Sequence, residues 1–177
     1  IGRRRGVGLM KLPSPSKVGG ILTASFLLFL TMSSIQQSLP PYRIIIGLQE
    51  VACLPWKVFF WKKPDTVAFD RFDPVLFSAR GMGPYIPDGM PVIKLVAGVP
   101  GDRVKIKEGK LYINDRFLDD LNDGIRAFKK PTNYWDKEYV LGDDEVFMFG
   151  SEPRSYDSRY WGPYPKHLVR GRVSALF

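Results

Sequence analysis

Three short segments of the sequence carry side chains that could perform nucleophilic chemistry. The first is ACLP (52–55), which holds Cys53, and the second is PVIKLVAGVPGD (91–102), which holds Lys94. The third is SYDSRYWG (155–162), with Ser155, Asp157 and Arg159. A thiol is a good nucleophile, and a lysine amine that has lost its proton can act as a general base near neutral pH. The three segments therefore indicate covalent catalysis by a nucleophile and a base.

Lys94 lies between Ile93 and Leu95 in an apolar run that reads as a buried strand ending in a Gly/Pro turn. Lysine is rarely buried unless it is paired, because desolvation of the ammonium is costly and favours loss of the proton. The alternative is a half-buried strand in which Val92 and Lys94 share the solvent face, since such alternation is common. The strand itself is predicted in both cases.

Taken in this order, the three segments resemble the conserved boxes of the type I signal peptidase family, which are membrane-bound serine proteases with a Ser/Lys dyad. The match is best to the branch found in conjugative DNA-transfer systems, which has CLP-type and DSRYWG-type motifs, and it covers residues 49–177. The resemblance implies Cys53 as nucleophile, Lys94 as base and Ser155 as the hydroxyl that orients the lysine. It implies a buried ion pair between Asp157 and Arg159, and no metal or other cofactor.

The sequence departs from that family at the nucleophile itself, where Cys53 replaces serine. The exchange is chemically viable, because a thiol with an ordinary pKa near 8.5 loses its proton far more readily than a hydroxyl. Val51 stands where the family often supplies a hydroxyl to the oxyanion hole, and GSEPRS (150–155) replaces a Gly-Asp-Asn loop. These departures keep a second hypothesis open, in which Cys53 is inert and the protein is a catalytically inactive structural subunit of a conjugation or secretion machine.

A Cys/His dyad with His167 as base is a rival arrangement, although a lone histidine is more often a surface residue. One cysteine excludes an internal disulfide, and one histidine argues against a metal cluster. A self-cleaving regulator with the same fold is a weaker alternative, because those proteins are soluble and this chain carries a candidate anchor.

The net charge of +8 is concentrated near the start of the chain. Residues 1–17 contain no acidic side chain and hold the basic residues Arg3, Arg4, Arg5, Lys11 and Lys17, so a nucleic-acid partner is not indicated. Residues 18–38 form an uncharged run of roughly the 20 residues that a spanning helix needs. We interpret this run as a membrane anchor rather than a cleavable targeting peptide, because its apolar core is long and no clean cleavage site follows.

The basic residues on one side of the run predict a cytoplasmic segment 1–17, by the positive-inside rule. Residues 39–177 then form an extracytoplasmic peptidase-like domain, in the periplasm of a bacterium with the anchor in the inner membrane.

The domain is expected to be mainly β, a signal peptidase-like β-sheet fold with short hairpins and no repeats. We predict a buried strand over 43–48, a hairpin of 57–61 with 66–72, a hairpin of 103–107 with 111–114, and strands over 145–150 and 167–176. Residues 119–138 read as a charged surface insertion. Phe59, Phe60 and Trp61 pack in the core or, in the alternative, dip into the lipid surface.

The sequence thus predicts a membrane-anchored endopeptidase that processes exported precursors with a Cys/Lys dyad. By resemblance, the substrate is a pilin precursor of a conjugative system. Membrane lipid and other conjugation-apparatus subunits are the expected partners.

Overall fold

The computed structural model describes residues 42–47 and 53–177, which lie in one compact unit, Pro41–Phe177. The expected basic segment 1–17, the expected anchor 18–38 and Val51 lie outside the described residues. No helix within 42–47 and 53–177 is both long enough and apolar enough to cross a membrane.

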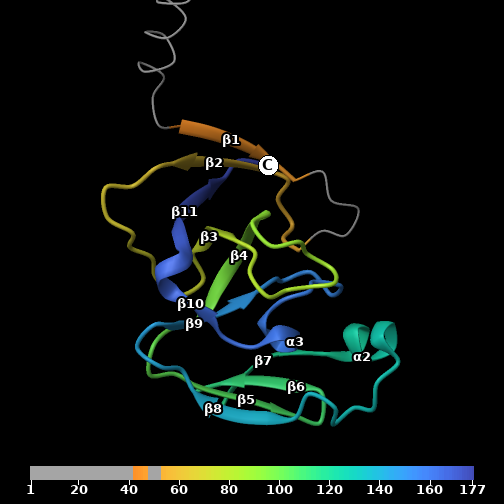
Figure 1. The fold of residues 1–177 in the computed structure, drawn as a ribbon. Helices are drawn as coiled ribbons and strands as arrows, with labels where there is room; N and C mark the ends of the chain where they lie inside the picture. Colours follow the sequence, from red (N-terminus) through yellow and green to blue (C-terminus); the bar gives the residue numbers. More distant parts are fainter. Residues whose placement is uncertain (1–41, 48–52) are drawn as a thin grey trace, which may run out of the picture. The chain divides into compact units, whose positions relative to one another are not determined.

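Two antiparallel sheets make up most of the described unit, which confirms the prediction of a mainly β fold (Figure 1). The larger sheet contains, in spatial order, β1 (Tyr42–Ile46), β2 (Val58–Lys62), β11 (Val169–Ala175), β3 (Pro74–Ser78), β4 (Pro91–Gly98), β9 (Glu145–Phe149) and β10 (Tyr164–Pro165). The smaller sheet contains β7 (Arg116–Asp120), β6 (Lys110–Ile113), β5 (Arg103–Lys107) and β8 (Lys137–Val140). The helical segments are α2 (Asn122–Phe128), α3 (Ser158–Trp161) and the 3-10 turn η1 (Lys166–Leu168).

The predicted lysine strand and the 103–107 hairpin are confirmed, as β4 and as the pair β5–β6. The predicted hairpin of 57–61 with 66–72 is wrong. Strand β2 pairs with β1 on one edge and with β11 on the other, so no edge is left for residues 66–72, which form a loop. Partner choice depends on residues more than 100 positions away, which local alternation does not reveal.

Strand β1 exists as predicted but is not buried. It is the end strand of the larger sheet, and Ile44 and Ile46 are 68% and 60% exposed. Phe59 in the adjacent β2 is buried, in agreement with the core interpretation, whereas Phe60 stacks on Tyr42 with ring centroids 5.3 Å apart. This edge of the sheet is therefore apolar and open to its surroundings.

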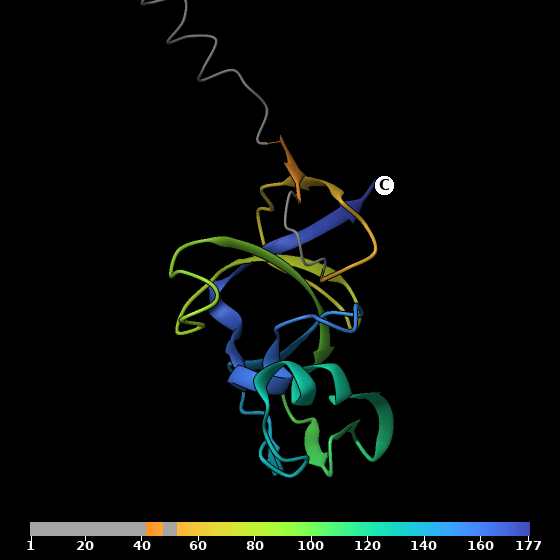
Figure 2. The same ribbon diagram turned by 90° about the vertical axis from the view of Figure 1, so that its right-hand side faces the viewer.

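Residues 119–138, predicted as a charged surface insertion, contain regular secondary structure. The segment contains the end of β7, helix α2 and the start of β8 (Figure 2). The helix is only seven residues long and includes Gly124, so it leaves no helical periodicity in the sequence. The last strand is β11, and η1 occupies the beginning of the range predicted for it.

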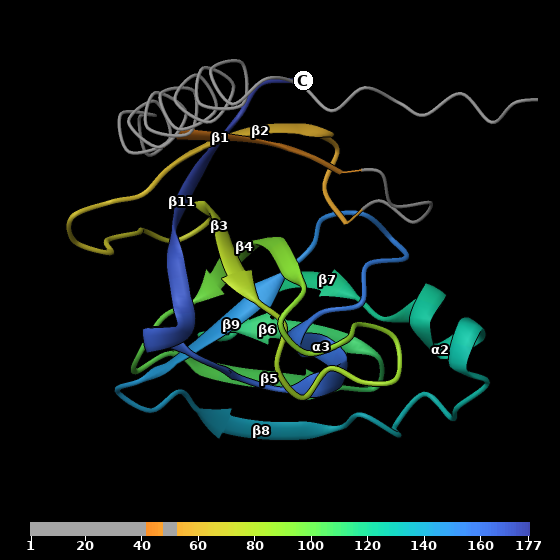
Figure 3. The ribbon, with the colours of Figure 1, turned by 45° about the horizontal axis from the view of Figure 1, so that its top comes forward.

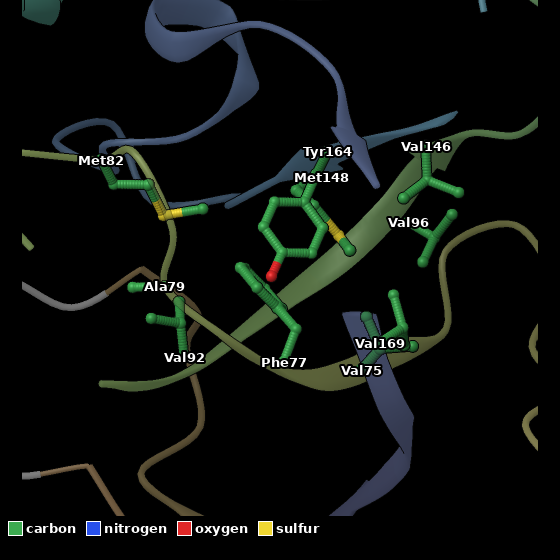
Figure 4. Packing of buried hydrophobic residues seen from close by; sticks show 10 residues of the cluster. All are labelled: Val75, Phe77, Ala79, Met82, Val92, Val96, Val146, Met148, Tyr164 and Val169. Atoms are coloured by element: carbon green, nitrogen blue, oxygen red, sulfur yellow. The ribbon is translucent and has the colours of Figure 1, made fainter. Parts of the chain in front are cut away.

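The hydrophobic core has a part on the larger sheet and a part between the two sheets. In the first, Tyr164 from β10 packs on Phe77 with ring centroids 4.7 Å apart (Figure 4). The Tyr164 hydroxyl donates to the carbonyl oxygen of Ser78. The second part joins Phe147 of β9 to Ile106 of β5. Strands β4 and β9, which are paired and lie side by side (Figure 3), contribute residues to both parts.

Candidate active site

Lys94 occupies the middle of β4 and is fully buried. It shares a face of the strand with Val92 and Val96, which are also buried, and Val75 lies opposite it on β3. The alternative that placed Lys94 on the solvent face is therefore wrong. The Lys94 Nζ donates a hydrogen bond of 2.7 Å to the Oγ of Ser155, which is also buried.

Ser155 is supplied by the loop after β9, and this loop is tied to Cys53. The N–H of Ser155 donates to the carbonyl of Glu152 at 2.9 Å, and the N–H of Glu152 donates to the carbonyl of Cys53 at 3.3 Å. A Cβ on Gly150 would lie 2.0 Å from Ser155 Oγ and 2.6 Å from the Cys53 carbonyl oxygen, so only glycine fits. The fold thus brings Cys53, Ser155 and, through Ser155, Lys94 to one place.

Asp157 and Arg159 form the buried ion pair that the resemblance implied. The Arg159 Nε donates to Asp157 Oδ1 at 2.9 Å, and its Nη2 donates to Asp157 Oδ2 at 2.7 Å. The same two side chains hold Gly150, because Asp157 Oδ2 accepts from the Gly150 N–H at 2.9 Å and Arg159 donates to the Gly150 carbonyl at 3.1 Å. The pair therefore fixes the glycine on which Cys53 and Ser155 converge.

Asp119 is a third member of this network, and sequence reasoning missed it. Its Oδ2 accepts from Arg159 Nη1 at 2.6 Å, across 40 residues of sequence. Burial alone would lower the pKa of Arg159, but the charge and hydrogen bonds of Asp157, helped by Asp119, outweigh burial and raise that pKa above its ordinary value. The only sequence signal for Asp119 was its position in a charged segment, which does not predict its pairing with Arg159.

A second ion pair fixes the turn at the end of β4. Asp102 accepts from both terminal nitrogens of Arg71, at 2.6 and 2.9 Å, and also from the N–H of Val99 and the amide of Asn114. Burial disfavours the charged carboxylate, yet the hydrogen bond from Arg71 and the others outweigh that effect and hold the pKa of Asp102 below 3.8. The Gly-Asp of the GVPGD motif is therefore a structural brace for β4, and the partner Arg71 was also missed.

Two hollows flank the half-buried Cys53. One, the apolar hollow, has a volume of about 170 Å³ and includes Ile45, Leu54, Phe59 and Ile93 in its lining. The other, of about 420 Å³, is lined by Cys53, Ser155 and a group of aromatic side chains. Cys53 lines both hollows, and Ser155, whose hydroxyl is bonded to the buried amine of Lys94, lines the larger one. An extended chain that occupied both hollows would therefore pass these residues.

His167 lies elsewhere. It is exposed, its Nδ1 is paired with Asp144, and it lines neither of the two hollows that Cys53 lines. Its pairing holds the pKa of Asp144 below the ordinary value, chiefly through their hydrogen bond. The geometry favours Lys94 over His167 as the base.

The chain is similar to known signal peptidases. The chain is 33% identical over 86 residues to a probable signal peptidase I-2 of Synechocystis, covering 48% of this chain and 37% of that protein. It is 28% identical over 124 residues to signal peptidase I V of Bacillus subtilis, covering 59% and 64%. A solved signal peptidase I of Enterococcus faecalis is 24% identical, with a TM-score of 0.40, covering 62% of this chain and all of that one.

The Synechocystis and Bacillus subtilis proteins are each matched over only part of their length, the Synechocystis protein over well under half. The family model described as signal peptidase, peptidase S26, matches residues 21–177, which include Cys53, Lys94 and the whole Ser155 segment. That range is most of the chain, so the protein belongs to the signal peptidase family, peptidase S26.

Proposed function

We propose that the protein is a signal peptidase-type endopeptidase in which Cys53 is the nucleophile and Lys94 is the general base. The observation that supports this most directly is the 2.7 Å hydrogen bond between Lys94 Nζ and Ser155 Oγ, in a buried position beside a hollow that Cys53 also lines. Nothing in ordinary strand packing requires a buried lysine at this point, because Val92 and Val96 fill the same face with apolar groups.

The reaction begins with transfer of the Cys53 thiol proton to the uncharged amine of Lys94. The sulfur attacks the scissile carbonyl, and the backbone N–H of Cys53 donates to the oxyanion that forms. The C–N bond then breaks as Lys94 returns the proton to the leaving amine, which yields a thioester and the released product. Water attacks the thioester, Lys94 accepts a proton from that water, and the proton passes to the departing thiolate, which restores the enzyme.

Ser155 is the positioning residue for the base. Its hydroxyl is buried and bonded to Lys94 Nζ, so it holds the amine in one rotamer. Asp157 and Arg159 act one step further away, because they fix the backbone of Gly150 against which Ser155 and Cys53 pack. Loosening any of these contacts would displace the reacting groups, and displacement of about 1 Å costs roughly 100-fold in rate.

We further propose that the substrate is an exported precursor protein, and that residues 18–38 anchor the enzyme in a bacterial inner membrane with the catalytic domain in the periplasm. The exposed apolar edge of the sheet, with Ile44 and Ile46 on β1, supports a position close to lipid. The CLP and DSRYWG motifs favour a pilin precursor of a conjugative system as the particular substrate, with other transfer subunits as partners.

Processing of a co-expressed pilin precursor tests the proposal. The wild type should cleave the precursor, and Cys53→Ala and Lys94→Ala should leave it uncleaved. Lys110→Ala, which changes an exposed lysine on β6, should process it normally. Equal processing by the wild type, Cys53→Ala and Lys94→Ala would instead establish the second candidate, a structural subunit with an inactive peptidase fold, which the replacement of serine by Cys53 favours.

A further inference from the structure

The larger hollow beside Cys53 has an aromatic wall that the catalytic steps do not use. We call it the aromatic groove. Its wall includes Tyr85, Met90, Phe128, Tyr156 and Tyr160, and the charged residues Asp123 and Arg154 also line the hollow. Neighbouring rings touch one another, with centroids 5.5 Å apart for Tyr85 and Phe128, and 5.3 Å apart for Phe128 and Tyr160. The groove therefore presents one continuous aromatic surface in the same hollow that Cys53 lines.

Three separate parts of the chain build this wall. Tyr85 comes from the loop between β3 and β4, Phe128 from the end of α2, and Tyr160 from α3, which lies beside α2 in Figure 1. Helix α2 is seated closely, because a Cβ on Gly124 would lie 2.0 Å from the hydroxyl oxygen of Tyr160. Burial raises the pKa of Tyr160 to about 12, and its hydroxyl is uncharged at neutral pH, as that of an ordinary tyrosine also is.

Part of the wall is exposed to solvent as it stands. Tyr85 is 60% exposed and Met90 is 41% exposed, although both lie beside a hollow large enough for one or two side chains. Aromatic and apolar surface left open in a concave site gains stability when an apolar group covers it. The groove is thus complementary to an aromatic or long aliphatic side chain.

The chemistry of the proposed dyad determines which part of a substrate meets the groove. Lys94 must deliver its proton to the leaving amine, so the residues after the scissile bond lie on the side of Lys94 and Ser155. Among the described residues, Ser155 lines the aromatic groove and not the apolar hollow. The product side of the substrate consequently points into the aromatic groove, and the apolar hollow is left for the residues before the bond.

We propose that the aromatic groove binds the first residues of the released product and selects for an aromatic or long aliphatic side chain among them. This inference rests on the proposed function, because it takes the scissile bond to lie at Cys53. It assigns part of the substrate preference to the mature end of the precursor.

Cleavage of internally quenched peptides tests the inference. The peptides share all residues before the scissile bond and carry phenylalanine, leucine, glycine or lysine at the first or the second position after it. The wild type should cleave the best phenylalanine peptide with a kcat/KM at least about tenfold above the matching glycine peptide. A ratio near one at both positions, with efficient cleavage, would overturn the inference and leave the proposed function standing.

Variants of the wall locate the preference. Tyr85→Ala and Phe128→Ala should each reduce the phenylalanine-to-glycine ratio by several-fold, while Phe117→Ala, an exposed aromatic on β7 outside the groove, should keep the wild-type ratio. Phe128→Leu keeps an apolar side chain on α2 and should retain most of the ratio, which guards against loss of folding in Phe128→Ala. An unchanged ratio in both alanine variants would overturn the assignment to this groove.

A binding measurement separates the two proposals. The tetrapeptide amide Phe-Ala-Ser-Gly is titrated against Cys53→Ala protein, with Gly-Ala-Ser-Gly amide as the control, and intrinsic fluorescence is followed. The groove assignment is supported if the phenylalanine peptide binds and Phe128→Ala weakens that binding at least about tenfold. If this holds while no peptide is cleaved, only the proposed function fails. Equal binding of the two peptides, or none, would overturn the groove assignment.

Discussion

Lys94 and Ser155, 61 residues apart in the sequence, are joined by a 2.7 Å hydrogen bond between two buried side chains. A lysine on the apolar face of a central strand is costly to desolvate, so its burial lowers the stability of the folded state. Its hydrogen-bond partner Ser155 supplies a hydroxyl, not a carboxylate, and a hydroxyl can hold an amine in place without fixing its charge. This is the relationship expected of a base rather than of a structural ion pair.

Replacement of Lys94 by methionine should separate activity from stability. Methionine has a similar length and no charge to desolvate, so Lys94→Met should be at least as stable as the wild type in urea. Its turnover should fall by about 10²- to 10⁴-fold, because the base is gone. Lys110→Met, at an exposed position on β6, is the control and should change neither quantity. Turnover within about tenfold of the wild type would contradict the role of Lys94.

Alkylation should inactivate the enzyme through one residue, because Cys53 is the only cysteine in the chain. Treatment with iodoacetamide should reduce cleavage in proportion to the fraction of alkylated protein, which mass spectrometry measures. A substrate peptide should slow both the alkylation and the loss of activity. Lys94→Met should react more slowly, because thiolate is the reactive form and the base is missing. Full cleavage activity in completely alkylated protein would show that the thiol is not the nucleophile.

The sequence was most informative where a feature depends on neighbouring residues. Alternation in PVIKLVAG predicted β4, and the family resemblance paired Lys94 with Ser155, which a hydrogen bond joins in the structure. The pairing of β2 with β11 and the contact of Arg159 with Asp119 were not predictable in this way, because each joins segments far apart in the chain. Local propensity limits what a residue can form, whereas the partner is chosen by packing of the whole sheet.

The aromatic groove was missed for the same reason. Its wall combines Tyr85, Phe128 and Tyr160, which come from three separated segments with no shared pattern. Helix α2, which carries Phe128, is too short to show an apolar stripe.

Removal of one partner from the buried ion pair should be far more harmful than removal of an exposed one. Arg159→Met leaves Asp157 buried without its cation and should cost about 3–5 kcal/mol of unfolding free energy. The double variant Asp157→Leu with Arg159→Met should cost less than the sum of the two single changes, since neither charge is then stranded. Arg126→Met, which breaks the exposed pair with Asp123, should stay within about 0.5 kcal/mol of the wild type. Urea denaturation measures all four, and additive losses would contradict a coupled pair.

Acid should weaken the brace at the end of β4 through Asp102. The hydrogen bonds from Arg71, Val99 and Asn114 hold the folded-state pKa of Asp102 below 3.8, so the unfolded chain takes up the proton first as the pH falls. The stabilisation is therefore complete above that ordinary value and is lost as the pH falls through the lower, folded-state pKa. Measured by urea denaturation from about pH 7 down to about pH 2, the stability gap between the wild type and Asp102→Asn should narrow only in the acid range. Asp143→Asn, at an exposed turn position, is the control and should not show this acid-dependent change in stability gap. If the gap between the wild type and Asp102→Asn stays constant to the lowest pH, the carboxylate charge of Asp102 contributes nothing to the brace.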